Sequence, residues 1–404
     1  MSWGVLLDGG DRQHADAAVR VILAELADRA VERCDLNGAA GLACLFAYAG
    51  DERHAHRGAE HLDAATAALE TSIAATGLWS GIAGVRFAIA HLADAGDAAV
   101  VLAAIDRALL EALAIERWNA SYDLIGGLCG IGVAALESGR TADAIALRVL
   151  DHLEALAERH PHGVTWFTPP ERLPAWQRER CPSGHHNLGL AHGVPGVIAL
   201  LARYLELGLA VERARPLLRA AMAWLLAAVP TRTPRRFPPW LGEPGDANAA
   251  RLAWCYGDPG VTIALLRAAR ALGDAATEAE ARGLARAIAT CSFDDADVAD
   301  TGLCHGVAGL AHVLNRLYQA TGDAIVGDAA RRWFARLLAM WRPGDGLAGF
   351  RTLRIVDGTD AWIEDASLLT GVTGVALALL AATTELEPRW DCVLACDVAP
   401  LESA

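Results

Sequence analysis

Charged and apolar positions alternate along this chain in a repeating pattern. Stretches with charges on one face and Ala, Leu and Val on the other alternate with nearly uncharged runs. The amphipathic stretches include residues 12–33, 97–116, 142–159 and 323–340, and the uncharged runs include 194–205, 261–266 and 372–380. An amphipathic helix lies on a surface, whereas a helix that is apolar on all sides is enclosed. The pattern therefore predicts outer helices that alternate with inner helices.

A Gly-x-x-Gly pair precedes each apolar run. The seven pairs are Gly38/Gly41, Gly81/Gly84, Gly127/Gly130, Gly193/Gly196, Gly257/Gly260, Gly306/Gly309 and Gly371/Gly374. One such pair is weak evidence, but seven copies in similar contexts indicate an internal repeat. We expect the glycines to tighten the turn between the two helices and to let inner helices approach one another closely.

Seven helical hairpins could form an open solenoid or a closed ring. Closure is favoured, because an open array would leave the apolar inner face in contact with water. The sequence thus predicts an all-α fold, an α/α toroid with inner and outer helix rings, as a single domain over residues 1–404. The long intervals between repeats predict irregular rim loops at about 160–187, 230–248 and 341–365, where binding residues usually lie.

The composition of the chain excludes several classes of function. Acidic residues outnumber basic ones, 49 to 35, which argues against nucleic acid or an anionic membrane as a partner. Every basic residue is arginine, which excludes lysine Schiff bases and P-loops. Nine cysteines and a start without a basic signal-peptide region predict a cytoplasmic protein with free thiols. The uncharged residues 366–384 could span a membrane by length, but the repeat favours a buried helix and no stable membrane insertion.

The residue directly before the first glycine defines a column through the repeats. Its members are Asn37, Ser80, Gly126, His192, Tyr256, His305 and Thr370. Successive inner helices point the same way, so equivalent positions should converge on one rim. One position further back are Cys255 and Cys304. We therefore expect His192, Cys255, Cys304 and His305 to lie close together.

Two thiolates and one imidazole are a good ligand set for zinc, and three protein ligands leave one position open, as in catalytic zinc sites. The alternative is that these cysteines are small buried hydrophobes, as most are. We expect this for the cysteines outside the column, which are Cys34, Cys44, Cys129, Cys291, Cys392 and Cys396. A rival metal cluster, Cys181 with His185 and His186 in a rim loop, lacks a second thiolate.

Two further charged residues lie just upstream of glycine pairs. Asp123 precedes Gly127 by four residues, and Arg251 precedes Gly257 by six. Charges in apolar surroundings need partners. The two could form a salt bridge across the rim, or they could belong to a polar active site beside the column.

Four strings resemble the lanthionine synthetase C family, the lanthipeptide cyclases. They are YDLIGG at 122–127, LAHGVPG at 190–196, WCYGDPG at 254–260 and GLCHGVAG at 302–309, and the glycine repeats extend the resemblance over nearly the whole chain. The resemblance implies an α/α toroid that binds one zinc ion per chain through Cys255, Cys304 and His305. It also implies active-site roles for Asp123, His192, Arg251 and Tyr256.

The reaction implied by the resemblance is a Michael-type addition. A cysteine thiol of a dehydrated precursor peptide would attack dehydroalanine or dehydrobutyrine and close a lanthionine or methyllanthionine ring. His192 could protonate the resulting enolate or first take the thiol proton. No dehydratase-sized segment precedes the repeats, so a separate dehydratase is an expected partner.

Two other functions remain open from sequence. The same zinc site would serve a relative that adds glutathione to dehydrated residues, or a non-catalytic zinc-bearing scaffold in a peptide-modifying complex. Toroidal glycosidases and terpenoid cyclases rank low, because the chain has no DxDD string and no obvious carboxylate pair in the column.

Overall fold

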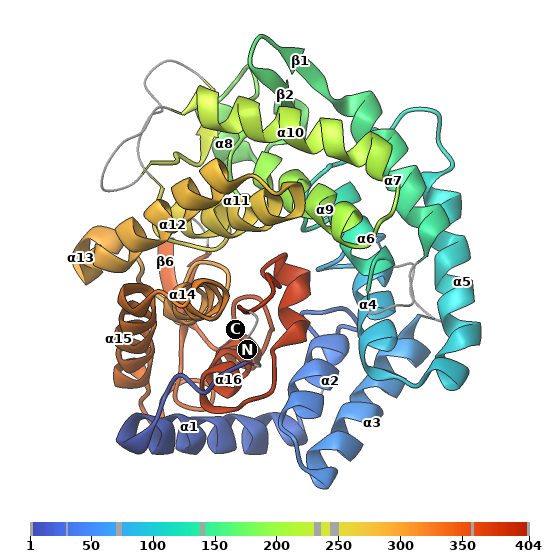
Figure 1. The fold of residues 1–404 in the computed structure, drawn as a ribbon. Coiled ribbons are helices and arrows are strands. Elements are labelled where there is room, and N and C mark those ends of the chain that lie inside the picture. The colour runs from blue at the N-terminus through green and yellow to red at the C-terminus, as the bar shows by residue number, and fades with distance from the viewer. Residues whose placement is uncertain are drawn as a thin grey trace. The chain divides into compact units, whose positions relative to one another are not determined.

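Each apolar run forms a helix that begins one residue after the first glycine of its pair, as predicted. The computed structural model describes residues 3–29, 31–69, 75–137, 142–229, 236–242, 250–356 and 359–401. The inner helices are α2 (Ala39–Tyr48), α4 (Ile82–Leu92), α6 (Leu128–Ala135), α9 (Val194–Glu206), α11 (Asp258–Leu272), α14 (Val307–Thr321) and α16 (Val372–Thr383) (Figure 1).

The amphipathic stretches form the outer helices. These are α1 (Gly9–Ala27), α3 (Glu52–Ala68), α5 (Ala95–Leu113), α7 (Asp143–Leu156), α10 (Val211–Ala228), α12 (Ala275–Thr290) and α15 (Ala324–Met340). An inner helix packs on the outer helix that follows it in sequence, for example α2 on α3 and α14 on α15. The predicted all-α arrangement of inner and outer helices is thereby confirmed.

Two glycines show why the repeat requires this residue. Gly257 has φ +93°, and a Cβ atom there would lie 2.3 Å from the carbonyl oxygen of Arg251. A Cβ atom at Gly260, in the first turn of α11, would lie 2.2 Å from the carbonyl oxygen of Trp254. The chain before the helix therefore folds back directly over the helix start, which only glycine permits.

The contacts divide the chain into two units. The first unit comprises Met1–Ala74, Ala289–Asp391 and Asp397–Ala404, and the second comprises Ala75–Ile288 and Cys392–Cys396. In the first unit α16 packs on α14 and α2, and α1 covers α16 and α15. In the second, the inner helices α4, α6, α9 and α11 pack in chain order, with α5, α7 and α10 outside them (Figure 1).

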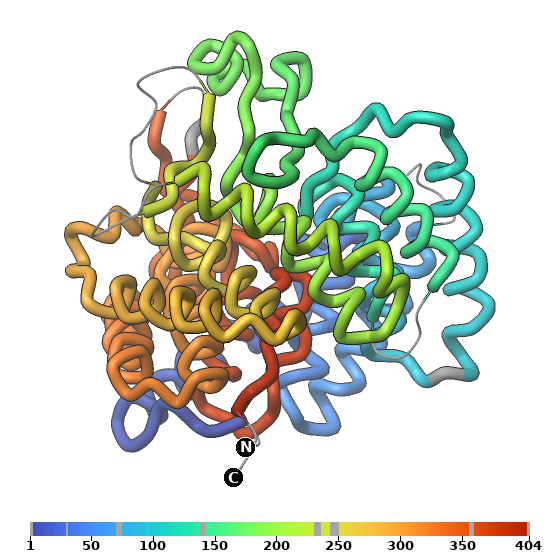
Figure 2. Tube along the Cα trace, turned by 45° about the horizontal axis from the view of Figure 1, so that its top comes forward, coloured from blue at the N-terminus to red at the C-terminus, as the bar shows by residue number. Residues whose placement is uncertain are grey.

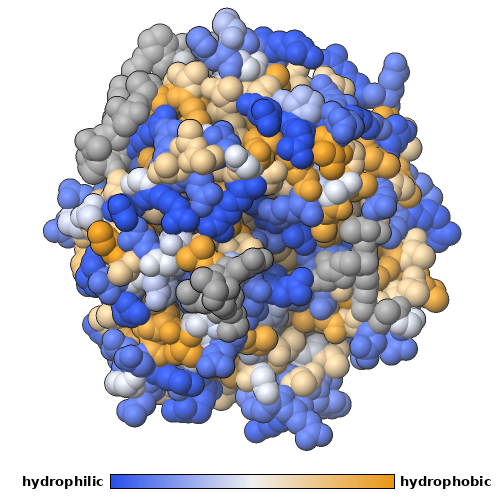
Figure 3. Space-filling view, in the orientation of Figure 1, coloured by the Kyte–Doolittle hydropathy of each residue, from blue (hydrophilic) through white to orange (hydrophobic). Residues whose placement is uncertain are grey.

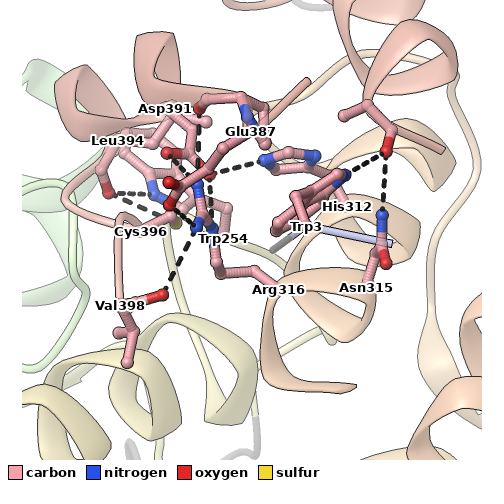
Figure 4. Close-up of polar contacts among 12 residues, drawn as sticks. Trp3, Trp254, His312, Asn315, Arg316, Glu387, Asp391, Leu394, Cys396 and Val398 are labelled. Carbon is pink, nitrogen blue, oxygen red and sulfur yellow. Dashed lines mark hydrogen bonds and ion pairs between the residues drawn. The ribbon is translucent and has the colours of Figure 1, made fainter. Parts of the chain in front are cut away.

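A buried ionic network ties the C-terminal segment of the first unit to α14 (Figure 4). Arg316 donates from Nε and Nη2 to the carboxylate of Asp391, at 3.0 and 2.9 Å. His312 Nε2 lies 2.9 Å from the same carboxylate, and Arg316 Nη1 donates to Glu387 at 2.8 Å. The side chains of Arg316 and Asp391 are fully buried. Charge pairing in the core therefore holds this C-terminal segment against α14.

The rim segments contain short ordered elements. The segment between α7 and α9, green in Figure 2, carries β1 (Glu158–His160), β2 (Gly163–Thr165), η1 (Pro170–Arg172), α8 (Ala175–Arg180) and β3 (His186–Asn187). β3 pairs with β4 (Trp240–Leu241), and β5 (Thr352–Val356) pairs with β6 (Thr359–Ile363). The remaining elements are α13 (Phe293–Ala296) and η2 (Arg389–Leu394). Most of the predicted loop 230–248 lies outside the described residues.

None of the helices in the described ranges is both long and apolar enough to cross a membrane. Residues 366–384, whose length left that possibility open, contain α16, which is buried along nearly all of its length. On the face drawn in Figure 3, polar side chains are interspersed among apolar ones.

Candidate active site

The loops that carry the glycine pairs are joined to one another at the predicted column. In the second unit the backbone N–H of Leu124 donates to Ala191 O at 3.0 Å, and that of Ala191 donates to Cys255 O at 3.3 Å. In the first unit the N–H of Cys304 donates to Leu369 O at 2.8 Å. Within each unit, equivalent positions of successive repeats therefore lie side by side.

Asp123 and His192 form a pair in the second unit. Nδ1 of His192 lies 2.7 Å from Oδ2 of Asp123, whose other oxygen accepts the N–H of Gly126 at 2.9 Å. Burial alone would lower the pKa of His192, but the hydrogen bond and charge of Asp123, and then the nearby Cys255, raise it above its ordinary value. Burial opposes ionisation of Asp123, yet its bond to His192 lowers its pKa. The pairing therefore favours the imidazolium form of His192 and the carboxylate form of Asp123.

Tyr256 covers the imidazole. Its ring stacks on His192 with centroids 5.9 Å apart, and its hydroxyl accepts a hydrogen bond from Asn187 Nδ2 at 3.2 Å. Burial, and to a smaller extent Cys255, raise the pKa of Tyr256, so the phenol keeps its proton. Asp123, His192, Tyr256 and Cys255 thus lie together in the second unit.

Arg251 has a different environment. Its side chain is exposed, and among the described residues it forms no salt bridge with Asp123, which pairs with His192. The salt-bridge alternative from sequence is therefore not realised. Asp123, and not Arg251, therefore orients His192.

Cys304 and His305 occupy the column in the first unit. The thiol sulfur of Cys304 and a ring nitrogen of His305 lie within 4.8 Å of each other. Nε2 of His305 is 3.4 Å from Oδ2 of Asp300, a carboxylate that is only 2 % exposed. Among the residues described, neither oxygen of Asp300 has a hydrogen-bond partner. A buried carboxylate facing an imidazole is the arrangement that orients histidine ligands of metals.

Sequence reasoning missed Asn187 and Asp300, which share an offset. Both lie six residues before the first glycine of a pair, as do Ser121 and Asp365. At Ser121, Asn187 and Asp365 the side chain accepts the backbone N–H two residues further on, at 3.2, 2.9 and 2.8 Å. Asp300 does not make this bond, so its carboxylate is left to His305. Aligning the repeats at the position six residues before the first glycine would have revealed both residues.

The rival cluster does not assemble. Cys181 is buried with Leu173 and Trp240, and the His185 ring stacks on Trp240 at 5.2 Å. His186 lies instead with Glu158 and His160. Four cysteines outside the column, Cys44, Cys129, Cys392 and Cys396, are buried, and Cys34 and Cys291 are half-buried.

The chain is a helical-hairpin repeat protein with a candidate site at its glycine loops. This class is defined by its glycine-capped inner helices, its amphipathic outer helices and the histidine–aspartate pair at those loops. The model of the family described as lanthionine synthetase C-like protein matches residues 33–395, and the chain belongs to this family.

Two relatives are consistent with this assignment. The chain is 24 % identical over 265 residues to nisin biosynthesis protein NisC of Lactococcus lactis subsp. lactis; the match covers 58 % of this chain and 60 % of that protein's length. It also resembles a solved nisin cyclase with a TM-score of 0.72 at 19 % identity, over 95 % of this chain and 97 % of the other. This likeness confirms the predicted fold class, the α/α toroid.

Proposed function

We propose that this chain is a zinc-dependent lanthipeptide cyclase. It adds cysteine thiols of a dehydrated precursor peptide to dehydroalanine or dehydrobutyrine and forms lanthionine or methyllanthionine rings. The observation that carries the proposal is the Asp123–His192 pair beside Cys255 at the glycine loops of a lanthionine synthetase C-like chain. A separate dehydratase would supply the substrate.

The reaction needs one proton to move and no group to leave. The thiol loses its proton to solvent and the thiolate sulfur forms a bond to the β-carbon. The double-bond electrons move onto the α-carbon and its carbonyl, and a proton from the acid then arrives at the α-carbon, so that the net change is one proton moved from sulfur to carbon. The Asp123 carboxylate favours the protonated form of His192, and the His192 side chain is 39 % exposed, so it can reach substrate and donate that proton. Asp123 keeps the proton-bearing ring oriented through Nδ1, which leaves Nε2 directed away from Asp123.

Cys255, Cys304 and His305 would hold the zinc ion. The donor set suits zinc, and the Asp300 carboxylate beside His305 Nε2 supports it, because it fixes the tautomer in which Nδ1 carries the lone pair. When bound, zinc lowers the pKa of a coordinated thiol so that the thiolate predominates at neutral pH.

Tyr256 and Arg251 complete the proposed site. The protonated phenol of Tyr256, held by Asn187, donates a hydrogen bond toward a developing enolate oxygen or positions the His192 ring beneath it. The exposed guanidinium of Arg251 binds peptide carbonyl or carboxylate groups at the rim.

The test is a cyclisation assay on a dehydrated peptide that carries one dehydroalanine and one cysteine. Ring closure does not change the mass, so free thiols are counted by alkylation followed by mass spectrometry. We expect loss of the alkylated species with wild-type protein and its persistence with His192→Ala. Transfer of free glutathione to the peptide without ring closure would instead support the glutathione-adding function. Zinc binding with neither activity would support the scaffold.

A further inference from the structure

A second group of metal-ligating side chains lies in the segment between α7 and α9. One carboxylate oxygen of Glu158 and one ring nitrogen each of His160 and His186 lie within 4.8 Å of one another. All three residues belong to the second unit, and none belongs to the column. The group contains no thiolate, so it is chemically distinct from the proposed cyclase zinc site.

Strand geometry brings these side chains together. Alternate residues of a strand point to the same side, so Glu158 and His160 project together from β1, with Glu158 Oε2 3.8 Å from His160 Nε2. His186 comes from β3, which pairs with β4. Its Nδ1 atom is buried and makes no hydrogen bond of good geometry among the residues described, although the backbone of Trp166 lies beside the ring. A buried ring nitrogen without a well-formed hydrogen bond is costly, and a ligand that binds it removes that cost.

Aromatic packing holds both imidazoles in place. Trp224 of α10 contacts the rings of His186 and His160, at 5.4 and 6.2 Å between centroids. The two imidazoles meet edge to face at 5.4 Å. The hairpin itself lies so close to α10 that a Cβ atom at Gly163 would be 2.0 Å from Ala220 O. Ligands whose rotamers are fixed by such packing make precise metal sites.

We propose that Glu158, His160 and His186 bind a divalent transition-metal ion of the Zn²⁺ class. Two imidazoles with one carboxylate are a known ligand set for such ions, whereas Ca²⁺ and Mg²⁺ prefer oxygen ligands throughout. With metal–ligand bonds of about 2.0–2.2 Å, two donor atoms on one ion lie at most about 4.4 Å apart. Glu158 Oε2 and His160 Nε2 already meet this condition at 3.8 Å, and the exposed side chain of Glu158 can adjust to the ion.

The bound ion would join the two ends of the segment 161–185. Closing a loop of this length with a metal stabilises the folded state, because the unfolded chain has no preformed site. His186 is followed by Asn187, which donates to the hydroxyl of Tyr256. The ion would therefore steady the strand that positions Tyr256, and its role is structural.

The test uses Zn²⁺ alone, titrated by calorimetry into Cys304→Ala, which removes a ligand of the other site. We expect one Zn²⁺ per chain. His186→Ala in this background should abolish binding, and Glu158→Gln should weaken it at least about tenfold, the lower end of the cost of losing an outer-sphere partner at metal sites. Glu158 is exposed, so its variant reports binding without a folding defect. His162→Ala, in the turn of the same hairpin, is the matched control and should bind as Cys304→Ala does.

Absence of Zn²⁺ binding to folded Cys304→Ala would overturn the proposal, as would unchanged binding in both His186→Ala and Glu158→Gln. If Cys304→Ala does not fold, Co²⁺ is titrated into the metal-free wild type. Two equivalents should then bind, one of them without a thiolate charge-transfer band, and a single thiolate-bound equivalent would overturn the site. Cyclisation by the wild type is a separate measurement, so failure of this site and failure of the proposed function are distinguishable.

Discussion

Nδ1 of His192 lies 2.7 Å from Oδ2 of Asp123, although 69 residues separate the two in sequence. His192 directly precedes one glycine pair and Asp123 lies four residues before another, and the two glycine loops are joined by the bond from Leu124 N–H to Ala191 O. The repeat thus determines the position of the pair, and the carboxylate determines which ring nitrogen faces the ligand. Both features can be tested by substitution.

Asp123→Asn should lower the pKa of His192. The carboxylate contributes most to raising it, and the amide removes the negative charge while keeping the shape. The imidazolium would then deprotonate at lower pH, and the alkaline limb of the cyclisation pH profile would move down. NMR titration of the His192 ring measures the pKa directly. An unchanged pKa would show that Asp123 is not its main determinant.

The same pair makes stability depend on pH. The raised pKa of His192 gives stabilisation that is complete below its unfolded value, about 6.5, and is lost as pH rises through the folded value. The lowered pKa of Asp123 gives stabilisation that is complete above about 3.9 and is lost as pH falls through the folded value. The unfolding midpoint of the wild type should therefore exceed that of Asp123→Asn most between about pH 4 and pH 6.5. A difference that grows above pH 8 would contradict the pairing.

His192→Ala should retain zinc and lose ring formation. Loss of a general acid or base typically slows a reaction by about 10²–10⁴-fold. The rate is followed by alkylation of free thiols, with metal content measured on the same sample. His56→Ala, on the exposed face of α3, is the control and should cyclise at the wild-type rate. An unaltered rate in His192→Ala would remove this residue from the mechanism.

Cys304→Ala should lose the cyclase zinc and cyclisation while keeping its helical circular dichroism. The substitution removes one of the three proposed ligands, and the remaining Cys255 and His305 would bind zinc far more weakly. Cys291→Ala, a half-buried cysteine outside the column, is the matched control and should keep the metal. Dialysis against a weak chelator removes loosely held ions, and elemental analysis then measures the zinc that remains. Full zinc retention by Cys304→Ala would disprove the ligand assignment.

Asn187→Ala should slow cyclisation without removing zinc. Asn187 positions Tyr256 through a 3.2 Å hydrogen bond and is itself fixed by the N–H of Gly189. Small misplacements at an active site can cost up to about 100-fold, so we expect a loss of roughly ten- to a hundredfold in kcat with little change in KM. Tyr256→Phe should give a similar loss, and the double variant should add little to it. Fully additive losses would show that the two residues act independently.

The inner helices could be predicted from sequence because glycines of the pairs, such as Gly257 and Gly260, are steric requirements of the turn. At Gly260 any side chain would collide with the Trp254 carbonyl, so the motif marks the start of the helix. The column followed from the same register, and it placed His192 beside Tyr256 correctly.

Other features depend on contacts that no repeat position specifies. Asp300 and Asp365 lie at the same offset from a glycine pair, but their carboxylates have different partners. The carboxylate of Asp365 accepts the N–H of Ser367, whereas that of Asp300 faces His305. The group of Glu158, His160 and His186 arises from a short hairpin and a two-residue strand that the irregular sequence of this segment did not predict.

The buried network of the first unit was also hidden in the sequence, because the partner of Arg316 is 75 residues away. Arg316→Met should destabilise the fold by about 3–5 kcal/mol, because it leaves the fully buried Asp391 carboxylate without its main counter-charge. Glu387 contacts the same guanidinium but is 38 % exposed, so Glu387→Gln should cost about 1 kcal/mol or less. Urea unfolding of the two variants against wild type measures both values. Equal and small effects would show that water reaches Asp391, and that packing rather than charge holds the C-terminal segment.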